Sequence, residues 1–349
     1  MSVLTRLYRG ETTIDFISQR KRWFALSLAL LIISILSLLF RGLDGSVDFT
    51  GGVIVEADNV SQVNTAGVRD GLAEIGRDGA RVQLTGGGTI IVQTEALDGA
   101  AQDELVATVA AIAGVTTDDT NVDAVGPTFG DEVTRRAIQA LVIFLIVVAL
   151  FISWRFEWKM ALAALAALFH DLLITAGIYS VVGFEVTPAT VIAVLTILGY
   201  SLYDTVVVFD KITENVNDLH ARNTFSEIAN LSMNQVLMRS INTSLTTLLP
   251  IGSLLFIGSF LLGATTLREF ALALFIGVAA GTYSSIFVAT PLLAMWKERE
   301  PEWERMQRRA ERRFGDKEQA VATVLAEAAA VQVDSGAVAR PPRQRRKRR

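Results

Sequence analysis

Residues 187–209 of the chain read TPATVIAVLTILGYSLYDTVVVF. This apolar run is long enough to cross the ~30 Å hydrocarbon core of a membrane as a helix. It nevertheless carries one carboxylate, Asp204, and a charged side chain at that depth costs at least about 2.5 to 3.5 kcal/mol. The run therefore predicts a membrane-spanning helix, and Asp204 is the first candidate for proton or ion coupling.

Five other stretches share this length and apolar character, so the sequence predicts a polytopic α-helical membrane protein with six transmembrane helices. The predicted spans are residues 23–40, 137–154, 160–182, 187–209, 241–262 and 270–296. The last five form a predicted membrane domain, residues 137–296. No small-residue cleavage pattern follows the first span, so we interpret it as a retained anchor and not as a signal peptide.

Basic residues predict the orientation of these spans. Residues 20–22 read RKR directly before the first span, and Lys297 and Arg299 follow the last one. Because segments rich in Lys and Arg stay on the inner side of a membrane, we expect a cytoplasmic N-terminus, residues 1–22, and a cytoplasmic tail, residues 297–349.

The charge of the chain is distributed unevenly. Residues 44–134 carry 16 acidic against 3 basic side chains, whereas residues 297–349 carry 15 basic against 9 acidic ones. The overall net charge of -4 therefore says little about partners. The chain has no Cys and only 2 His, which excludes disulfides and thiolate metal sites and makes a His-rich metal site unexpected. We predict no metal and no cofactor.

One sizeable soluble domain, residues 44–132, lies between the first two spans. Its hydrophobic pattern predicts strands at 47–57, 81–84, 89–94 and 121–125, with helices at 61–75, where Ser61 is a candidate cap, and at 100–113. This βαββαβ order indicates a small ferredoxin-like α+β domain on the external side. The run Gly86–Gly88 is followed by no Gly-Lys-Ser/Thr, so we expect no nucleotide.

Two further segments lie on the predicted cytoplasmic side. Residues 211–240 mix polar and apolar side chains, which favours an amphipathic helix along the inner membrane surface; a solvated connector is the alternative. Residues 297–349 turn charged, then Ala-rich, and end in RQRRKRR. We predict that this tail is disordered and binds anionic lipid, with ribosomal RNA as the alternative.

Asp204 shares its helical face with three hydroxyl groups, those of Tyr200, Ser201 and Thr205, at or near one turn away. A carboxyl group that loads and unloads protons must titrate near neutrality, and desolvation in a helix bundle is able to produce such a change. The alternative is an Asp that is permanently paired to a cation and holds two helices together.

Arg239 is the cation that we expect opposite Asp204. With Asn242, Thr243 and Thr246 it forms a polar stripe at helical spacing. Lipid would leave such a stripe without hydrogen bonds, so we expect it to face the bundle interior or a water-filled path. The alternative is that Arg239 extends to headgroups of the inner leaflet.

His170 and Asp171 lie near the middle of the third span, where polar residues are equally costly. Adjacent helical residues point about 100° apart, so the two side chains need not share a partner. Both are candidates for a proton relay, and a hydrogen-bonded structural role between helices is the alternative. Small residues at 273, 277, 281 and 285 form a seam suited to close helix packing.

Several motifs resemble those of SecF proteins in the SecD/SecF family of bacterial protein-export membrane proteins. Asp48-Phe49-Thr50-Gly51-Gly52 resembles the DFTGG signature of the family, and Val125-Gly126-Pro127 with Gly130 resembles its VGP element. The pairs and runs His170-Asp171, Gly199-Tyr200-Ser201, Asp204-Thr205 and residues 242–247 also match. The resemblance covers residues 15–297. Tyr203 departs from the pattern, in which Asn commonly precedes the Asp.

This resemblance implies one half of an RND-type transporter in the bacterial cell membrane, with SecD as the other half. The implied role is to assist the late translocation of unfolded secretory polypeptides beside a SecYEG-type channel and an associated insertase. The proton-motive force would drive it, so the chain would be a transport subunit and not an enzyme, with protons as the coupling ion. Asp204 would carry the proton and Arg239 would be its basic counterpart. A scaffold that moves no protons and an exporter of lipid or small molecules are the alternatives.

Overall fold

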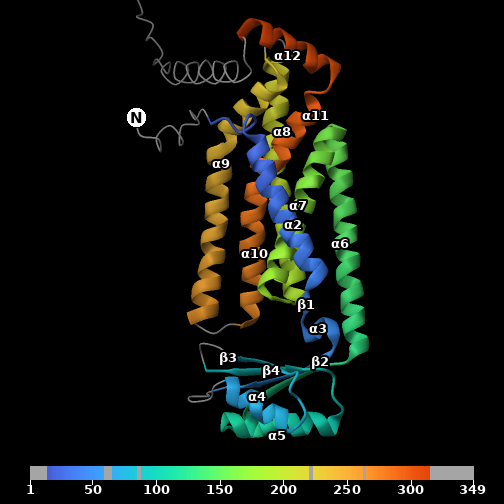
Figure 1. Ribbon diagram of the computed structural model, residues 1–349, viewed down its shortest axis with the longest axis vertical. Helices are drawn as coiled ribbons and strands as arrows, with labels where there is room; N and C mark the ends of the chain where they lie inside the picture. Colours follow the sequence, from blue (N-terminus) through green and yellow to red (C-terminus); the bar gives the residue numbers. More distant parts are fainter. Residues whose placement is uncertain (1–13, 59–64, 85–87, 220–222, 262–264, 315–349) are drawn as a thin grey trace, which may run out of the picture.

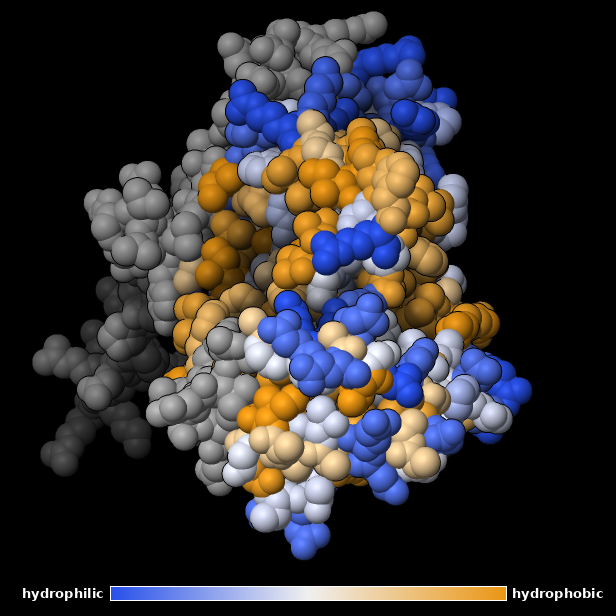
Figure 2. Space-filling view, turned by 60° about the horizontal axis from the view of Figure 1, so that its bottom comes forward, coloured by the Kyte–Doolittle hydropathy of each residue, from blue (hydrophilic) through white to orange (hydrophobic). Residues whose placement is uncertain are grey.

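The computed structural model describes residues 14–58, 65–84, 88–219, 223–261 and 265–314 of the 349-residue chain. Long helices run side by side, with a small sheet domain at one end and a short helix lying across the other end (Figure 1). Figure 2 shows hydrophobic residues concentrated over the helices and hydrophilic residues on the sheet domain and at the opposite end. This distribution fits a protein whose middle part lies in hydrocarbon.

Six helical segments among the described residues are long and apolar enough to cross a membrane, which agrees with the predicted fold class. They are α2 (Arg20–Phe40), α6 (Pro127–Arg155), α7 (Trp158–Val182), α8 (Pro188–Leu219), α9 (Phe225–Ser253) with its π-helical continuation η2 (Leu254–Leu261), and α10 (Thr265–Ser284) with the π-helical turn η3 (Ser285–Ala289) and α11 (Thr290–Lys297). Their order along the chain follows the six predicted spans.

The prediction of a separate amphipathic surface helix at residues 211–240 is wrong. α8 continues to Leu219 and α9 already begins at Phe225, so this segment is the paired ends of two long helices. Thr224 starts α9 with a capping box, in which its hydroxyl accepts from the Glu227 N–H and the Glu227 carboxylate accepts from the Thr224 N–H. Two backbone donors of the helix end are satisfied in this way.

Several polar residues of this segment are buried and bond inside the protein instead of facing water. Asn215 Nδ2 donates to Ser232 Oγ and to Gln235 Oε1, both at 2.8 Å, which joins α8 to α9. Asn234 accepts from the Ile14 N–H at 3.0 Å and donates to the Ile14 carbonyl at 2.8 Å. These bonds hold the N-terminal segment on α9, and they explain why polarity alone pointed wrongly to a surface.

The expectation of a disordered tail from residue 297 also needs correction. A helix, α12 (Pro301–Phe314), follows the last span. Trp303 of α12 is 4% exposed and packs edge-on against Phe225, with 5.2 Å between ring centroids. Glu298, just before α12, pairs with Arg20 at 3.0 Å. Residues 315–349, including the basic terminus, lie outside the described residues.

The sheet domain has the predicted βαββαβ order. Its elements are β2 (Gly52–Ala57), α4 (Thr65–Glu74), β3 (Arg81–Leu84), β4 (Ile90–Thr94), α5 (Gly99–Ala113), the 3₁₀ turn η1 (Thr117–Asp119) and β5 (Thr120–Val125). Within the described ranges the four strands form an antiparallel sheet in the order β3-β4-β2-β5. Val55 and Val92 of the sheet pack with Leu72 of α4 and Leu105 of α5 in one buried core. The candidate cap Ser61 lies outside the described residues.

The first predicted strand, residues 47–57, begins later than expected. Residues Val47–Thr50 form a short helix, α3, and the strand starts only at Gly52. Gly51 reverses the chain between them with φ +74°, a conformation that favours glycine. Before α3, the two-residue strand β1 (Asp44–Gly45) pairs in parallel with β6 (Glu185–Val186) of the loop between α7 and α8.

The two motifs that flank the sheet domain meet where it joins the helices. Gly51 lies so close to the start of α6 that a Cβ atom there would be 2.8 Å from Pro127 Cα. A Cβ on Gly130 would be 2.6 Å from the carbonyl oxygen of Phe49. Gly126 precedes α6 in an extended conformation and Pro127 opens the helix. Asp48 accepts from Ser46 Oγ at 3.1 Å. These motif residues therefore form a packing joint between α3 and α6.

A polar cluster forms a second joint between the sheet domain and the helices. Arg81 of β3 pairs with Asp44 of β1, and its Nη1 lies 3.9 Å from Glu185 Oε2. Gln93 Nε2 donates to the same Glu185 oxygen at 3.4 Å. Burial raises the pKa of Glu185, and the hydrogen bond from Gln93 and the charge of Arg81 only partly oppose this effect.

We expect the Gly177→Ala change to destabilise the bundle by about 1–3 kcal/mol because it overpacks the contact between α2 and α7. A Cβ on Gly177 would lie 2.7 Å from the Cα of Ser34, which is backbone and cannot rotate away. Gly199→Ala is the matched control, since a Cβ there meets nothing within 4 Å; it should be neutral or stabilising by about 0.5–1 kcal/mol. Thermal unfolding in detergent measures both. Equal stability of Gly177→Ala and the parent chain would contradict this packing.

The raised pKa of Glu185 predicts how the second joint responds to pH. An acid whose pKa is higher in the folded than in the unfolded state contributes stability at low pH that is lost as the pH rises through its folded pKa. Glu185→Gln should therefore raise the unfolding temperature at neutral pH, and this gain should fade on acidification. Glu95→Gln, at a side chain that is 78% exposed, is the surface control. A gain for Glu185→Gln that is constant with pH would contradict the interpretation.

Candidate functional site

Asp204 lies on α8 in the bundle interior and is 6% exposed. Its Oδ1 accepts a hydrogen bond from Ser240 Oγ of α9 at 2.7 Å. Its Oδ2 is buried and has no hydrogen-bond partner among the described residues. Buried polar atoms are nearly always paired because an unpaired one is costly, so a half-satisfied carboxylate here is a strong candidate for chemistry.

The expected pairing of Arg239 with Asp204 is not found in the described part of the chain. Arg239 is exposed, and its Nη2 donates to Tyr203 Oη at 2.8 Å while its guanidinium lies 5.9 Å from the Tyr203 ring centroid. Tyr203 itself is 51% exposed. Neighbouring residues of a helix point about 100° apart. The contact between α8 and α9 therefore has two separate pairs, Arg239 with Tyr203 outside and Ser240 with Asp204 inside.

The predicted polar stripe on α9 also faces outward. Asn242 and Thr246 are exposed and Thr243 is half-buried. The hydroxyl of Thr243 donates to the Arg239 carbonyl at 2.7 Å, and that of Thr246 donates to the Asn242 carbonyl at 2.8 Å. The threonine hydroxyls are therefore satisfied by their own helix, and the stripe does not face the interior of this bundle; the other expectation, that it faces a water-filled path, stays a prediction.

The stripe that does face the interior begins one residue later, at Ser240, and continues through Ser244 and Thr247. Ser244 Oγ lies 2.8 Å from Thr282 Oγ1 of α10. Thr247 Oγ1 donates to Tyr200 Oη of α8 at 3.0 Å. α9 is thus joined to both neighbouring helices by hydroxyl groups, and Tyr200 lies at this contact as a supporting residue.

Asp171 of α7 is a hydrogen-bonded centre for three helices. Its Oδ2 accepts from Ser201 Oγ of α8 at 2.6 Å and from Ser284 Oγ of α10 at 2.8 Å, and its Oδ1 lies 3.1 Å from His170 Nδ1. Its side chain is 0% exposed. The two carboxylates therefore differ: Asp171 has partners on both oxygens, whereas Asp204 has a partner on only one oxygen among the described residues.

Thr205 and His170 complete this layer of polar groups. Thr205 Oγ1 lies 3.0 Å from Ser285 Oγ, at the first residue of the π-helical turn η3. Such turns inside long helices are frequent at functional sites. The His170 ring stacks on Tyr283 with 6.1 Å between centroids, and its Nε2 has no hydrogen-bond partner in the described residues. The layer thus contains a second buried side-chain atom without a hydrogen-bond partner in the described residues.

The structure brings Asp204, Ser201, Thr205, Asp171 and His170 into one polar layer, with Tyr200 at its edge. It leaves out Arg239, Asn242, Thr243 and Thr246. Ser240, Ser244, Thr282 and Ser284 were not predicted as members of this layer, and Ser285 was predicted only as a small residue in a packing seam. The signal for the first two was the second helical stripe on α9, which is offset by one residue from Arg239. In the described ranges no cluster of three His, Cys, Asp or Glu side chains is placed to hold a metal ion.

Comparisons with known proteins agree on one family. The family description "Protein export membrane protein SecD/SecF, C-terminal" matches residues 105–299. Protein translocase subunit SecF of Streptomyces coelicolor is 44% identical over 306 residues, which cover 87% of this chain and 82% of that protein. The Mycobacterium tuberculosis subunit of the same name is 42% identical and covers 85% and 70%. The crystal structure of SecDF, a translocon-associated membrane protein from Thermus thermophilus, matches with a TM-score of 0.74 and 36% identity, over 82% of this chain and 39% of that one.

The unequal bonding of the two carboxylates predicts unequal effects on stability. Asp171→Ala removes the acceptor of two serine hydroxyls and of the His170 ring, so we expect it to destabilise the protein by about 3 kcal/mol or more. Asp204→Ala removes one hydrogen bond and an unsatisfied oxygen, and should change stability by about 1 kcal/mol or less. Thermal unfolding of the two purified variants tests this order. A reversed order would exclude a mainly structural role for Asp171.

Proposed function

Because the chain belongs to the SecF group of the SecD/SecF family of protein export membrane proteins, we propose that it uses the proton-motive force to assist late translocation of secretory polypeptides. In this proposal it is a transport subunit and not an enzyme, and protons are its coupling ion. The observation that most directly supports this proposal is the bonding of Asp204. Its carboxylate is buried, one oxygen accepts a hydrogen bond, and the other has no partner among the described residues.

Protonation of Asp204 would change the contact between α8 and α9. The charged carboxylate favours the Ser240 hydroxyl as a donor, and binding a proton to the free oxygen would remove the cost of a buried charge. The two protonation states would therefore favour different packing of the helices. One charge crossing 100 mV supplies about 2.3 kcal/mol. That is enough to shift a two-state equilibrium by about fiftyfold.

Arg239 would act as a movable counter-charge in this mechanism. It lies on the helix position next to Ser240, while Tyr203 lies next to Asp204, so the two pairs are neighbours. In the present arrangement the phenol of Tyr203 holds the guanidinium on the outer face. A rotation of α9 relative to α8 would bring this charge toward Asp204 and favour proton release. His170 and Asp171 would adjust the same layer from α7.

A SecD protein is the proposed partner for the outer face of α8 and α9. Arg239 and Asn242 are exposed there, inside a membrane-spanning segment, where lipid cannot satisfy the Asn242 amide or the Arg239 donors that Tyr203 does not use. A second polypeptide would do so. The SecDF structure supports this choice, because a chain similar to ours forms 39% of a longer polypeptide there. A proton path that starts at Asp204 would then be completed between the two halves.

The remaining assignments follow from charge and from the family. We propose that both termini are cytoplasmic and that the acidic sheet domain is external, on the side where the polypeptide emerges. A SecYEG-type channel and an associated insertase in the bacterial cell membrane are the proposed neighbours. The basic residues of the tail would bind anionic lipid.

We expect Asp204→Asn to abolish the stimulation of export by a proton gradient, because Asn cannot carry the proton. The measurement is the late translocation of a secretory protein into membrane vesicles that contain the channel, SecD and this chain, with and without an imposed gradient. Asp210→Asn is the matched control on the same helix: its carboxylate is exposed and pairs with Arg155 at 2.9 Å.

Two outcomes would argue against proton coupling. Full gradient stimulation by an Asp204→Asn variant that still assembles with SecD would exclude the role of Asp204. An equally strong defect with and without a gradient would instead favour a scaffold that stabilises the translocase without moving protons.

A further inference from the structure

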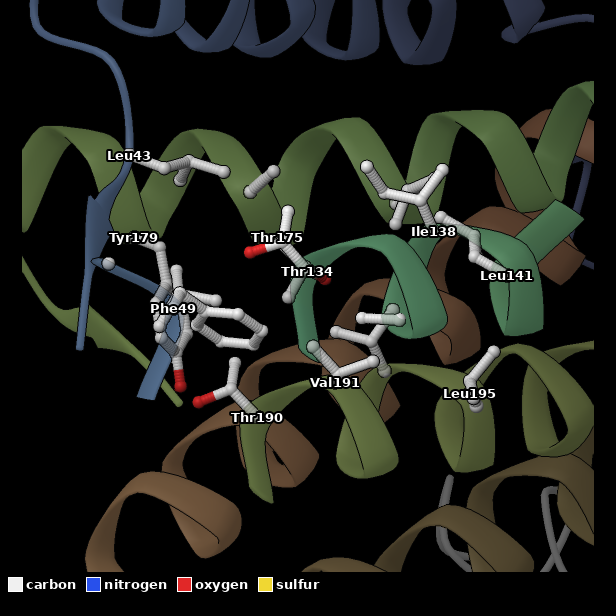
Figure 3. Close-up of a pocket in the computed structure, with 16 residues that line it drawn as sticks. Leu43, Phe49, Thr134, Ile138, Leu141, Thr175, Tyr179, Thr190, Val191 and Leu195 are labelled. Atoms are coloured by element: carbon white, nitrogen blue, oxygen red, sulfur yellow. The ribbon is translucent and has the colours of Figure 1, made fainter. Parts of the chain in front are cut away.

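An apolar cavity of about 400 Å³ lies between α6, α7 and α8, and Phe49 of α3 lines one end of it. Figure 3 shows Phe49 beside Tyr179 and Thr190 at one end of the cavity, and Leu141 and Leu195 at the other. Its volume is within the range of about 300–1,000 Å³ that is usual for ligand sites. It is separate from the polar layer around Asp204, and the proposed function makes no use of it.

The cavity exists because α6 contacts the bundle over only part of its length. Ile152, near the end of α6, is 0% exposed, whereas Ile138, near its start, is 58% exposed. The packing joint of α3 with Gly130 occupies the space beside the first turn of α6. Two small side chains, Ala137 of α6 and Ala176 of α7, lie in the wall and leave the space between the helices unfilled.

Two of the four hydroxyl-bearing side chains in the cavity wall, Tyr179 and Thr190, have hydrogen-bond partners inside the protein. Tyr179 Oη donates to the carbonyl of Glu269 at 3.2 Å. Thr190 Oγ1 lies 3.1 Å from Thr187 Oγ1 and accepts from the Thr187 N–H at the same distance. A water molecule needs two to four polar partners, and this wall offers it few. The cavity therefore suits an occupant made of carbon and hydrogen.

We propose that this cavity binds one acyl chain of a phospholipid from the leaflet on the side of the sheet domain. The cavity lies at the ends of membrane-spanning helices, where acyl chains are the surrounding medium. Its lining runs over about two turns of each helix, from Thr134 to Leu141 on α6 and from Leu172 to Tyr179 on α7, which suits an extended alkyl chain.

Basic side chains beside the cavity suit the phosphate of such a lipid. Arg135 and Arg136 stand between the wall residues Thr134 and Ala137, are 64% and 73% exposed, and both pair with Glu132. Residues 131–136 carry two bases and two acids, because Asp131 precedes Glu132, so these guanidinium groups offer exposed donors but no net positive charge. Arg41, two residues before the wall residue Leu43, uses Nη1 to bond the Val181 carbonyl at 2.8 Å. Arginine is the preferred side chain for phosphate recognition.

A bound acyl chain would act as a wedge. It would separate the first half of α6 from α7 and α8 while contacting Phe49 of α3. Because α3 and α6 are the elements that connect the sheet domain to the helices, the lipid would help to fix the orientation of that domain.

The test is photolabelling of the full chain in vesicles with phosphatidylglycerol that carries a diazirine near the end of one acyl chain. Mass spectrometry of the labelled peptides should place adducts on cavity-facing residues of α6, α7 and α8. Ala176→Phe fills the cavity and should reduce these adducts several-fold. Leu150→Phe, on a part of α6 that is 67% exposed, is the matched control and should leave them unchanged.

Three results would overturn the proposal. Adducts restricted to the exposed faces of α2 and α6, or cavity adducts that Ala176→Phe does not reduce, would exclude the acyl-chain site. Ala137→Leu repeats the filling from the opposite wall in case Ala176→Phe does not fold. Equal cavity labelling by a diacylglycerol with the same reactive chain would exclude recognition of a phospholipid.

Discussion

A carboxylate inside a hydrocarbon-spanning bundle has to be solvated by the protein itself, and much of this structure depends on that requirement. Serine and threonine hydroxyls supply the solvation here, and they are short. Ser240 reaches Asp204 at 2.7 Å, and Ser201 and Ser284 reach Asp171 at 2.6 and 2.8 Å. Helices joined by such short side chains must pack closely. Gly281 allows this close packing, since a Cβ there would lie 2.8 Å from the Ser201 Cβ. The glycine and the short hydroxyl side chains therefore serve the same close contact between α8 and α10.

The same requirement separates two carboxylates that look alike in sequence. The Asp171 carboxylate has hydrogen-bond partners on α7, α8 and α10, so any change to this group would disturb the contacts among all three helices. Asp204 has one partner and one free oxygen, and it lies at the contact between only two helices. The bundle thus contains one carboxylate bonded on both oxygens and one bonded on a single oxygen, about one turn of α8 apart, since Ser201 and Asp204 are three residues apart.

The sequence predicted those features that depend on local pattern. Span length identified the six helices, and alternation identified the order of the sheet domain. It could not predict the rotation of α9, because Arg239 and Ser240 belong to two polar stripes and only tertiary packing decides which stripe faces inward. It also misjudged residues 211–240, since buried side chains that bond one another, such as Asn215 and Ser232, have the same composition as a wet surface. The short helix α3 was not predicted, because strand propensity contains no information about the change of backbone direction at Gly51.

The two hydrogen bonds between Asn234 and Ile14 constrain the order in which this protein folds during synthesis. The two residues are separated by 220 positions, yet Asn234 bonds both the N–H and the carbonyl of Ile14. During synthesis the first helix therefore enters the bilayer with its leading segment still undocked, and that segment waits until α9 has been translated and inserted. The contact between Ile14 and Asn234 therefore forms late in biogenesis, only after α9, the fifth span, has been inserted.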